Sequence, residues 1–200
     1  MNTNNDNVIY ILILCEGKTE KLYFDLLKRV RRISRVEVEI IPHMGQHKNL
    51  IDSCIEYRNK VMEDKDLRID EIETWAISDN DKTANTIHYQ DLLNYAEFQE
   101  IHLAYSDPQF EIYLLQHFFE LNKSKQKKAK LESLLDAKIK EIGYDCGYSK
   151  SDLDWCESML DKEPKRLDRA LEYADKLGNH VKPPFTTVHH LVYRLLEFSV

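Results

Sequence analysis

An uninterrupted apolar run, Val8–Cys15, constrains the fold of this chain more than any other stretch. A strand with apolar side chains on both faces must be covered on both faces, which is typical of the centre of a parallel sheet. A second such run, Thr74–Ile77, is rich in β-branched and aromatic residues. Two more strands are predicted at Val36–Pro42, where apolar residues alternate with glutamates, and at Glu100–Tyr105.

Helical patterns separate these strands. The first helix follows Glu16-Gly17, and Thr19 is expected to cap it. Two more helices are predicted at Lys48–Glu63 and Ile87–Glu97, and a fourth should begin at Asp107-Pro108 with Asp107 as its cap. The order βαβαβαβα predicts an α/β fold, with a mostly parallel, Rossmann-like sheet of four strands flanked by helices.

The sequence changes character near residue 120, where a lysine-rich stretch begins. Helical patterns follow at Leu131–Ile142, Ser151–Leu160, Arg166–Leu177 and Val188–Phe198, and we expect no further strand. We therefore predict an α/β domain at residues 1–119 and a helical C-terminal region at residues 120–200. Because no linker rich in glycine and serine separates them, the region should pack on the domain.

Composition limits the classes of partner. The 200 residues carry a net charge of −7, whereas proteins that hold nucleic acid mainly by charge are usually basic. Any nucleic-acid contact must therefore be local, mediated by metal or supplied by a partner. The four cysteines lie far apart and show no Cys-x-x-Cys pattern, which favours a reduced, cytoplasmic protein. Without a basic N-terminal segment or an apolar run of membrane length, we expect neither a signal peptide nor a membrane span.

Carboxylates follow two of the predicted strands. Glu16 comes directly after the first strand, and Asp79 and Asp81 come after the third. Parallel strands end at one edge of the sheet, so these three side chains should lie together. Such like charges are costly unless a cation holds them, and oxygen ligands suit Mg²⁺ or Mn²⁺. The structural alternative is a solvated acidic turn, because Asp-Asn-Asp is common turn composition.

Three segments together resemble the RloB-like family, small Toprim proteins linked to bacterial restriction and antiphage loci. They are Cys15–Glu20, Ser78–Asp81 and Ser106–Phe118. The third segment carries the family-specific pattern, with Asp107 where the family has Asn and Tyr113 where it has Trp. The resemblance implies a Toprim-like fold and a metal-dependent nuclease that acts in antiphage defence. Its substrate would be RNA, with tRNA among the candidates, or DNA.

The resemblance also implies roles for single residues. Glu16, Asp79 and Asp81 would be the catalytic residues and would bind the metal. Glu20 and Glu111 could add a second metal site, although the helix dipole alone favours carboxylates in a first turn.

Three further side chains could take part in the chemistry. Lys18 and Lys82 could stabilise charge on a phosphate, or could be solvated loop lysines. His117 lies on the apolar face of its predicted helix, so a core histidine is favoured over a catalytic one.

Basic segments are candidate contacts for nucleic acid, although lysine-rich loops are more often simply solvated. The candidates are Lys123, Lys125, Lys127, Lys128, Arg31 and Arg32. Among the other histidines, including His180, His189 and His190, no zinc-like spacing is present.

Two other functions remain open from the sequence. The chain could be a non-catalytic or partner-activated effector subunit of a complex that contains an ATPase, and it could form a homo-oligomer. Alternatively, Asp79-Asn80-Asp81-Lys82-Thr83 fits the Asp-x-Asp-x-Thr signature of haloacid-dehalogenase-type phosphatases, with Asp79 as the nucleophile. That signature should follow the first strand, whereas two predicted strands precede it here.

Overall fold

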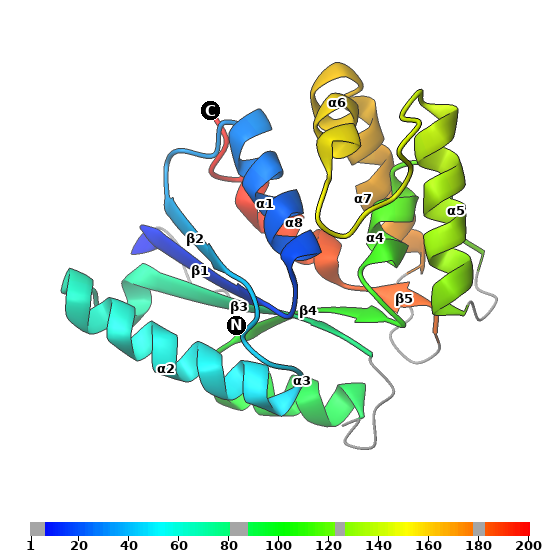
Figure 1. The fold of residues 1–200 in the computed structure, drawn as a ribbon. Helices are drawn as coiled ribbons and strands as arrows, with labels where there is room; N and C mark the ends of the chain where they lie inside the picture. The colour runs from blue at the N-terminus through cyan, green and yellow to red at the C-terminus, as the bar shows by residue number, and fades with distance from the viewer. Residues whose placement is uncertain (1–6, 81–87, 123–126, 178–182) are drawn as a thin grey trace.

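The computed structural model describes residues 7–80, 88–122, 127–177 and 183–200. Its centre is a twisted sheet with helices on both faces (Figure 1). The strands are β1 (Tyr10–Cys15), β2 (Glu37–Ile41), β3 (Ile72–Asp79), β4 (His102–Asp107) and β5 (Phe185–Thr186). They lie in the order β2-β1-β3-β4-β5, and all neighbours are parallel except β4 and β5. The prediction of an α/β fold with a mostly parallel sheet is therefore confirmed.

The strand register brings the ends of the central strands to one edge of the sheet. Cys15, the last residue of β1, pairs with Ile77 of β3, and Asp79, the last residue of β3, pairs with Ser106 of β4. The chain passes from β1 to β2 on one side and to β3 on the other. The edge between β1 and β3 is thus the point where the strand order reverses, which is where open α/β sheets place their ligands.

The expectation of no strand beyond residue 120 is wrong in one place. The two residues of β5 pair antiparallel with Ser106 and Asp107. Thr187 reinforces the pairing, because its hydroxyl accepts a 2.8 Å hydrogen bond from the Tyr105 amide. A strand of two residues shows no side-chain alternation, so the period on which sequence prediction depends is absent.

Helices α2 (Lys48–Lys65) and α3 (Tyr89–Phe98) cover one face of the sheet, below it in Figure 1. The short 3₁₀ helix η2 (Ile69–Glu71) leads into β3. Alternate residues of β1 serve the two faces: Leu12 and Leu14 pack in the cluster beneath α2 and α3, whereas Ile11 and Ile13 pack on the opposite side. A strand buried on both faces explains the uninterrupted apolar run.

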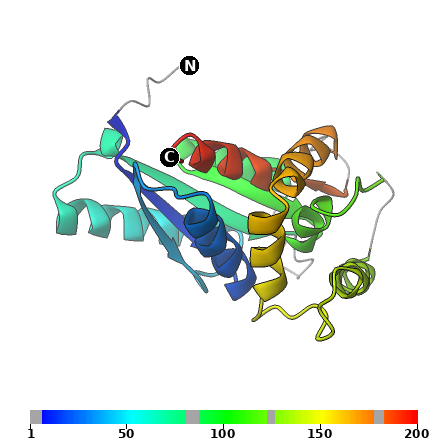
Figure 2. The same cartoon turned by 90° about the horizontal axis from the view of Figure 1, so that it is seen from above.

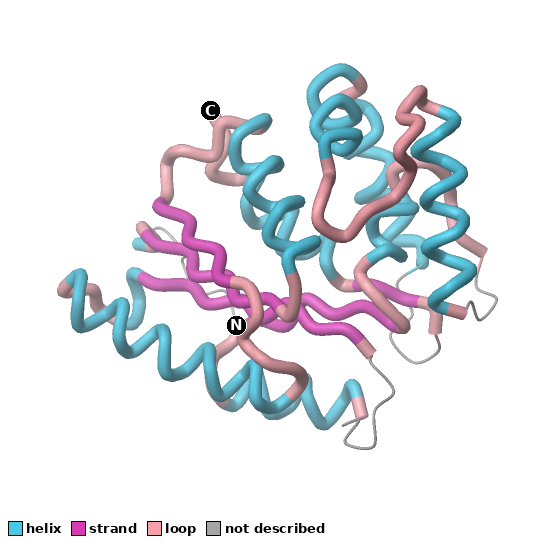
Figure 3. The backbone as a smooth tube through the Cα atoms, in the orientation of Figure 1, coloured by secondary structure: helices cyan, strands magenta, loops and turns pink. Residues whose placement is uncertain are grey.

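The remaining helices lie on the opposite side of the sheet, some against the strands and some against other helices (Figures 2 and 3). These are α1 (Lys18–Val30), α4 (Glu111–Gln116), α5 (Lys128–Glu141), α6 (Asp154–Lys162), α7 (Lys165–Leu177) and α8 (Val188–Leu196). A single hydrophobic cluster contains Phe24 and Phe110 together with Leu135, Leu171 and Leu191. The C-terminal helices thus share their core with the sheet, while the domain boundary near residue 120 stays a prediction.

Two predicted helix caps are wrong. Thr19 lies inside α1, and its hydroxyl donates to the Lys150 carbonyl at 3.0 Å instead of capping the helix. Asp107 is the last residue of β4, and α4 begins only at Glu111, because β4 continues past its predicted end at Tyr105. Within the described ranges, no helix combines the length and the apolar composition that crossing a membrane requires.

Candidate active site

Four carboxylates lie around one cleft at the edge where β1 and β3 end. The cleft has a volume of about 520 Å³, and Glu16, Glu20, Asp79 and Glu111 line it. Glu16 follows β1, Glu20 lies in the first turn of α1, Asp79 ends β3 and Glu111 begins α4. We call this site the acidic cleft. Of the predicted catalytic residues, the structure brings Glu16 and Asp79 together, whereas Asp81 lies outside the described residues.

Glu16 is held in place by the end of β3. Its Oε1 atom accepts hydrogen bonds from the Ser78 hydroxyl at 2.6 Å and from the Asp79 amide at 3.1 Å. Burial raises the pKa of Glu16, and these two donors act in the opposite direction by stabilising the charged form. The carboxylate is therefore fixed beside Asp79 although 62 residues separate it from Ser78 in the sequence.

Asp79 and Glu20 each hold a buried oxygen that has no hydrogen-bond partner among the described residues: Oδ1 of Asp79 and Oε2 of Glu20. Burial raises the pKa of Asp79 well above its usual range, and the charges of Glu20, Glu16 and Glu111 raise it further. The pKa of Glu20 rises to about 7, again from burial first, with Glu111 and Glu16 adding to it. Buried carboxylate oxygens without donors are costly, and a bound cation removes that cost.

Gly17 permits this arrangement of Glu20. A Cβ atom on Gly17 would lie 3.0 Å from Oε2 of Glu20, closer than ordinary packing allows. The glycine between Glu16 and the start of α1 therefore serves a close approach of the Glu20 carboxylate, in addition to the turn predicted from the sequence.

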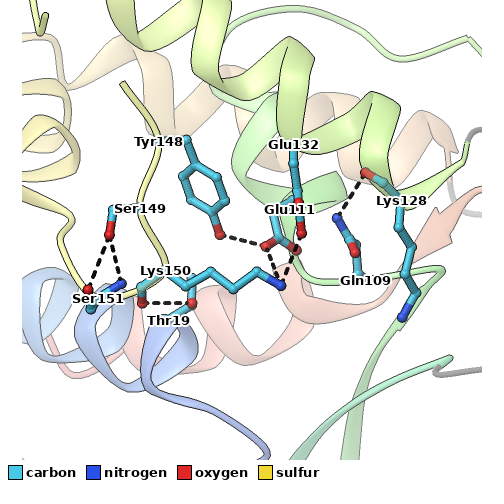
Figure 4. A network of polar contacts seen from close by, with 9 residues as sticks. All are labelled: Thr19, Gln109, Glu111, Lys128, Glu132, Tyr148, Ser149, Lys150 and Ser151. Atoms are coloured by element: carbon cyan, nitrogen blue, oxygen red, sulfur yellow. Dashed lines mark hydrogen bonds and ion pairs between the residues drawn. The ribbon is translucent and has the colours of Figure 1, made fainter. Parts of the chain in front are cut away.

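The loop before α6 reaches back to the acidic cleft and contacts Glu111 (Figure 4). The Tyr148 hydroxyl donates to Oε1 of Glu111 at 2.5 Å, and Nζ of Lys150 lies 3.7 Å from the same oxygen. Lys150 also forms a 3.0 Å ion pair with Glu132 of α5. Burial acts to lower the pKa of Lys150, but the charges of Glu111 and Glu132 raise it overall. A cation from the loop between α5 and α6 thus lies at the rim of the cleft.

The donor set fits a divalent cation bound by oxygen. Among the described residues, no three of the four carboxylates bring their oxygens within 4.8 Å of one another, so they surround the cleft without closing on one point. Mg²⁺ typically takes only one or two carboxylates and fills its other positions with water and phosphate oxygens. An open cleft with two buried oxygens that lack a partner among the described residues therefore suits Mg²⁺ or Mn²⁺ better than an ion enclosed entirely by protein.

The predicted basic residues divide into two groups. Lys18 lines the acidic cleft, and Lys128 lies close enough that Asp79 and Glu16 affect its pKa, which burial lowers overall. Arg31 and Arg32 follow the other end of α1, roughly 18 Å from its first turn at 1.5 Å per residue. The two arginines therefore do not belong to this site.

Lys127 immediately precedes α5 and is not among the described residues that line the cleft. Four predicted site residues cannot be placed because they lie outside the described residues: Asp81, Lys82, Lys123 and Lys125.

His117 lies in the core of the protein. Its ring is fully buried, with Nε2 3.1 Å from the Tyr23 hydroxyl and Nδ1 3.2 Å from the Leu114 carbonyl oxygen. Burial lowers its pKa to about 4. A neutral ring that holds α1 against α4 accounts for these contacts, and the ring does not line the cleft.

Several residues of the site carry no recognisable sequence signal. Lys150 and Tyr148 come from a loop between helices. His47 is 5% exposed, lies near enough to Glu16 to affect its pKa, and makes no hydrogen bond through either ring nitrogen to the described residues. Its position before α2, next to cleft residues His43 and Gln46, could be found only from the fold.

The comparisons with known proteins give one match. The family described as RloB-like protein matches residues 11–195, which include every described residue of the acidic cleft. No curated protein and no solved structure matches the chain.

Proposed function

The chain belongs to the RloB-like family, and from the chemistry of its acidic cleft we propose that it is a metal-dependent nuclease. The observation that supports this proposal is the pair of buried oxygens, on Asp79 and Glu20, that have no donor in the part of the chain that the structure describes. In a protein with a surplus of negative charge, holding four carboxylates together is unfavourable unless a cation is bound.

Mg²⁺ or Mn²⁺ would be held by Glu16 and Asp79, with Glu20 and Glu111 available for a second ion. When bound, such an ion supplies positive charge to a phosphodiester and lowers the pKa of a water molecule. Ser78 and the Asp79 amide orient Glu16 for this task, and Tyr148 orients Glu111. The fixed orientation of these carboxylates reduces the reorganisation needed when the substrate binds.

The substrate would contact cations at the rim of the cleft. Lys18, Lys128 and Lys150 surround the carboxylates and could hold the phosphates on either side of the cleaved bond. This local grip agrees with a net charge of −7, because no broad basic face is required. We propose RNA, tRNA in particular, or DNA as the substrate, and antiphage defence as the setting, both from the resemblance to Toprim effector proteins.

The direct test is incubation of total tRNA and plasmid DNA with the purified chain, with Mn²⁺ or with chelator. Asp79→Asn and Glu16→Gln should abolish cleavage, whereas Asp25→Asn, which alters an exposed carboxylate in a surface ion pair, should not. Calorimetry with Mn²⁺ runs beside the assay. Absence of Mn²⁺ binding would refute the proposal.

A chain that binds Mn²⁺ but cleaves neither substrate would favour the alternative of an effector subunit that needs a partner, and an ATPase would then be the first partner to test. Cleavage that persists in both Asp79→Asn and Glu16→Gln would show that the acidic cleft is not the active site.

A further inference from the structure

A second cluster of metal-binding side chains lies away from the acidic cleft, between α7 and α8. Asp175 near the end of α7 and His189 and His190 in the first turn of α8 place one ligand atom each within 4.8 Å of one another. We propose that these three residues bind Zn²⁺ or a similar transition metal. This inference is independent of the proposed nuclease function.

The donor types select the class of metal. Two imidazoles and a carboxylate suit Zn²⁺, Co²⁺, Ni²⁺ or Cu²⁺, whereas Mg²⁺ prefers sites made of oxygen, such as the acidic cleft. The two clusters would therefore take different ions from the same solution.

One of the three separations between ligand atoms matches a tetrahedral site, and all three lie within 4.8 Å. Metal–ligand bonds of about 2.0–2.2 Å at tetrahedral angles separate neighbouring ligand atoms by roughly 3.3–3.5 Å. Nε2 of His189 lies 3.2 Å from Oδ1 of Asp175, within a small adjustment of that separation. The ring centroids of His189 and His190 lie 4.2 Å apart, so both imidazoles are at the same end of the helix.

The surroundings fix the ligands and leave access from solvent. The Tyr193 hydroxyl donates to Oδ2 of Asp175 at 2.8 Å and leaves Oδ1 directed at His189, as supporting residues do around metal ligands. His189 is 1% exposed, whereas Asp175 and His190 are exposed. One buried and two exposed ligands would anchor an ion at the surface, where water can complete its coordination.

A metal in this position would strengthen the connection between two helices that already meet through the contacts of His189 and Tyr193 with Asp175. Helix α7 packs on α4, and α8 packs on β4, the strand next to β3 with its Asp79. No sequence pattern indicates the site, because His189 and His190 are adjacent and Asp175 lies 14 and 15 residues before them on another helix.

Zn²⁺ binding by the full chain tests the proposal, with excess Mg²⁺ present to compete for the acidic cleft. We expect calorimetry to detect Zn²⁺ binding that Mg²⁺ does not displace. His190→Gln and Asp175→Asn, which alter exposed side chains, should each weaken it about ten-fold or more. His88→Gln, an exposed histidine elsewhere, and Asp79→Asn in the acidic cleft should leave the affinity unchanged.

A second readout uses Co²⁺, whose visible absorption is intense in tetrahedral sites that contain nitrogen ligands. The band should appear in the wild type and in Asp79→Asn and be lost in His190→Gln. Equal Zn²⁺ affinity in the wild type and His190→Gln, or no Zn²⁺ binding at all, would overturn the proposal. Because Asp79→Asn is the variant that tests the nuclease, failure of one proposal is distinguishable from failure of the other.

Discussion

Acidification should destabilise the protein through His117. Its pKa is about 4 in the folded protein against an ordinary value of 6.5, because the ring is fully buried. Between pH 6.5 and pH 4 the ring is protonated in the unfolded chain but neutral in the folded protein. The contribution of the neutral ring to stability is therefore complete above pH 6.5 and is lost as the pH falls toward 4. Proton linkage with these two pKa values gives a loss of about 2 kcal/mol between pH 7 and pH 4.5.

The matched variant is His117→Gln, which keeps a donor and an acceptor but does not titrate. At pH 7 it should cost about 1–2 kcal/mol, because hydrogen bonds to Tyr23 and to the Leu114 carbonyl change their geometry. The free energy of unfolding, from urea titrations at pH 7 and pH 4.5 in chelator, should fall more steeply in the wild type. Between these two pH values the wild type should lose about 2 kcal/mol more than the variant.

Comparison with the variant is necessary because other buried groups titrate in the same range. The raised pKa of Glu20 acts in the opposite direction, since protonation of that carboxyl relieves repulsion in the acidic cleft. Parallel pH profiles for the wild type and His117→Gln would refute the buried-ring interpretation. Loss of nuclease activity in a His117→Gln protein of unchanged stability would assign His117 a catalytic role after all.

Three further outcomes are expected. Mn²⁺ at 100 times its dissociation constant should stabilise the wild type by about 2.7 kcal/mol, which raises the midpoint of thermal unfolding by roughly 5–10 °C. Asp79→Asn should lose most of that shift, and an equal shift in both proteins would exclude Asp79 as a ligand. Gly17→Ala should weaken Mn²⁺ binding in calorimetry because the added Cβ displaces Oε2 of Glu20, and it should change stability little because the extended backbone at φ −136° accepts alanine. An unaltered Mn²⁺ affinity would contradict this geometry. Lys150→Met should weaken substrate binding and reduce the slope of the logarithm of the binding constant against the logarithm of salt concentration by roughly 0.7–0.9. Fluorescence anisotropy measures this slope, with Lys138→Met as the surface control, and an unchanged slope would show that Lys150 contacts no phosphate.

The α/β fold could be predicted because its strands carry strong local signals. Tyr10–Cys15 is apolar throughout since both faces of β1 are covered, and this pattern needs no knowledge of the neighbouring strands. The helices between strands were found for the same reason, to within a few residues at their ends. β5 was not predicted because its two residues form a strand only through pairing with β4, and the identity of these two residues does not indicate that pairing.

The prediction of the site shows the same division. Glu16 and Asp79 could be placed together from the rule that parallel strands end at one edge, and the structure finds them joined through the Asp79 amide. Lys150 and His47 could not be predicted, because each reaches the cleft through the packing of a loop or a helix whose position depends on the whole core.

The sequence by itself therefore determined the class of fold, the family and the two carboxylates that terminate β1 and β3. The periodicity of apolar residues and the ends of strands are local properties that a single sequence shows. Only the tertiary structure decided which other charges surround those carboxylates and that Asp175 meets His189 across two helices. Such contacts depend on side chains that burial of a common core brings together, and that arrangement leaves no periodic pattern in the sequence.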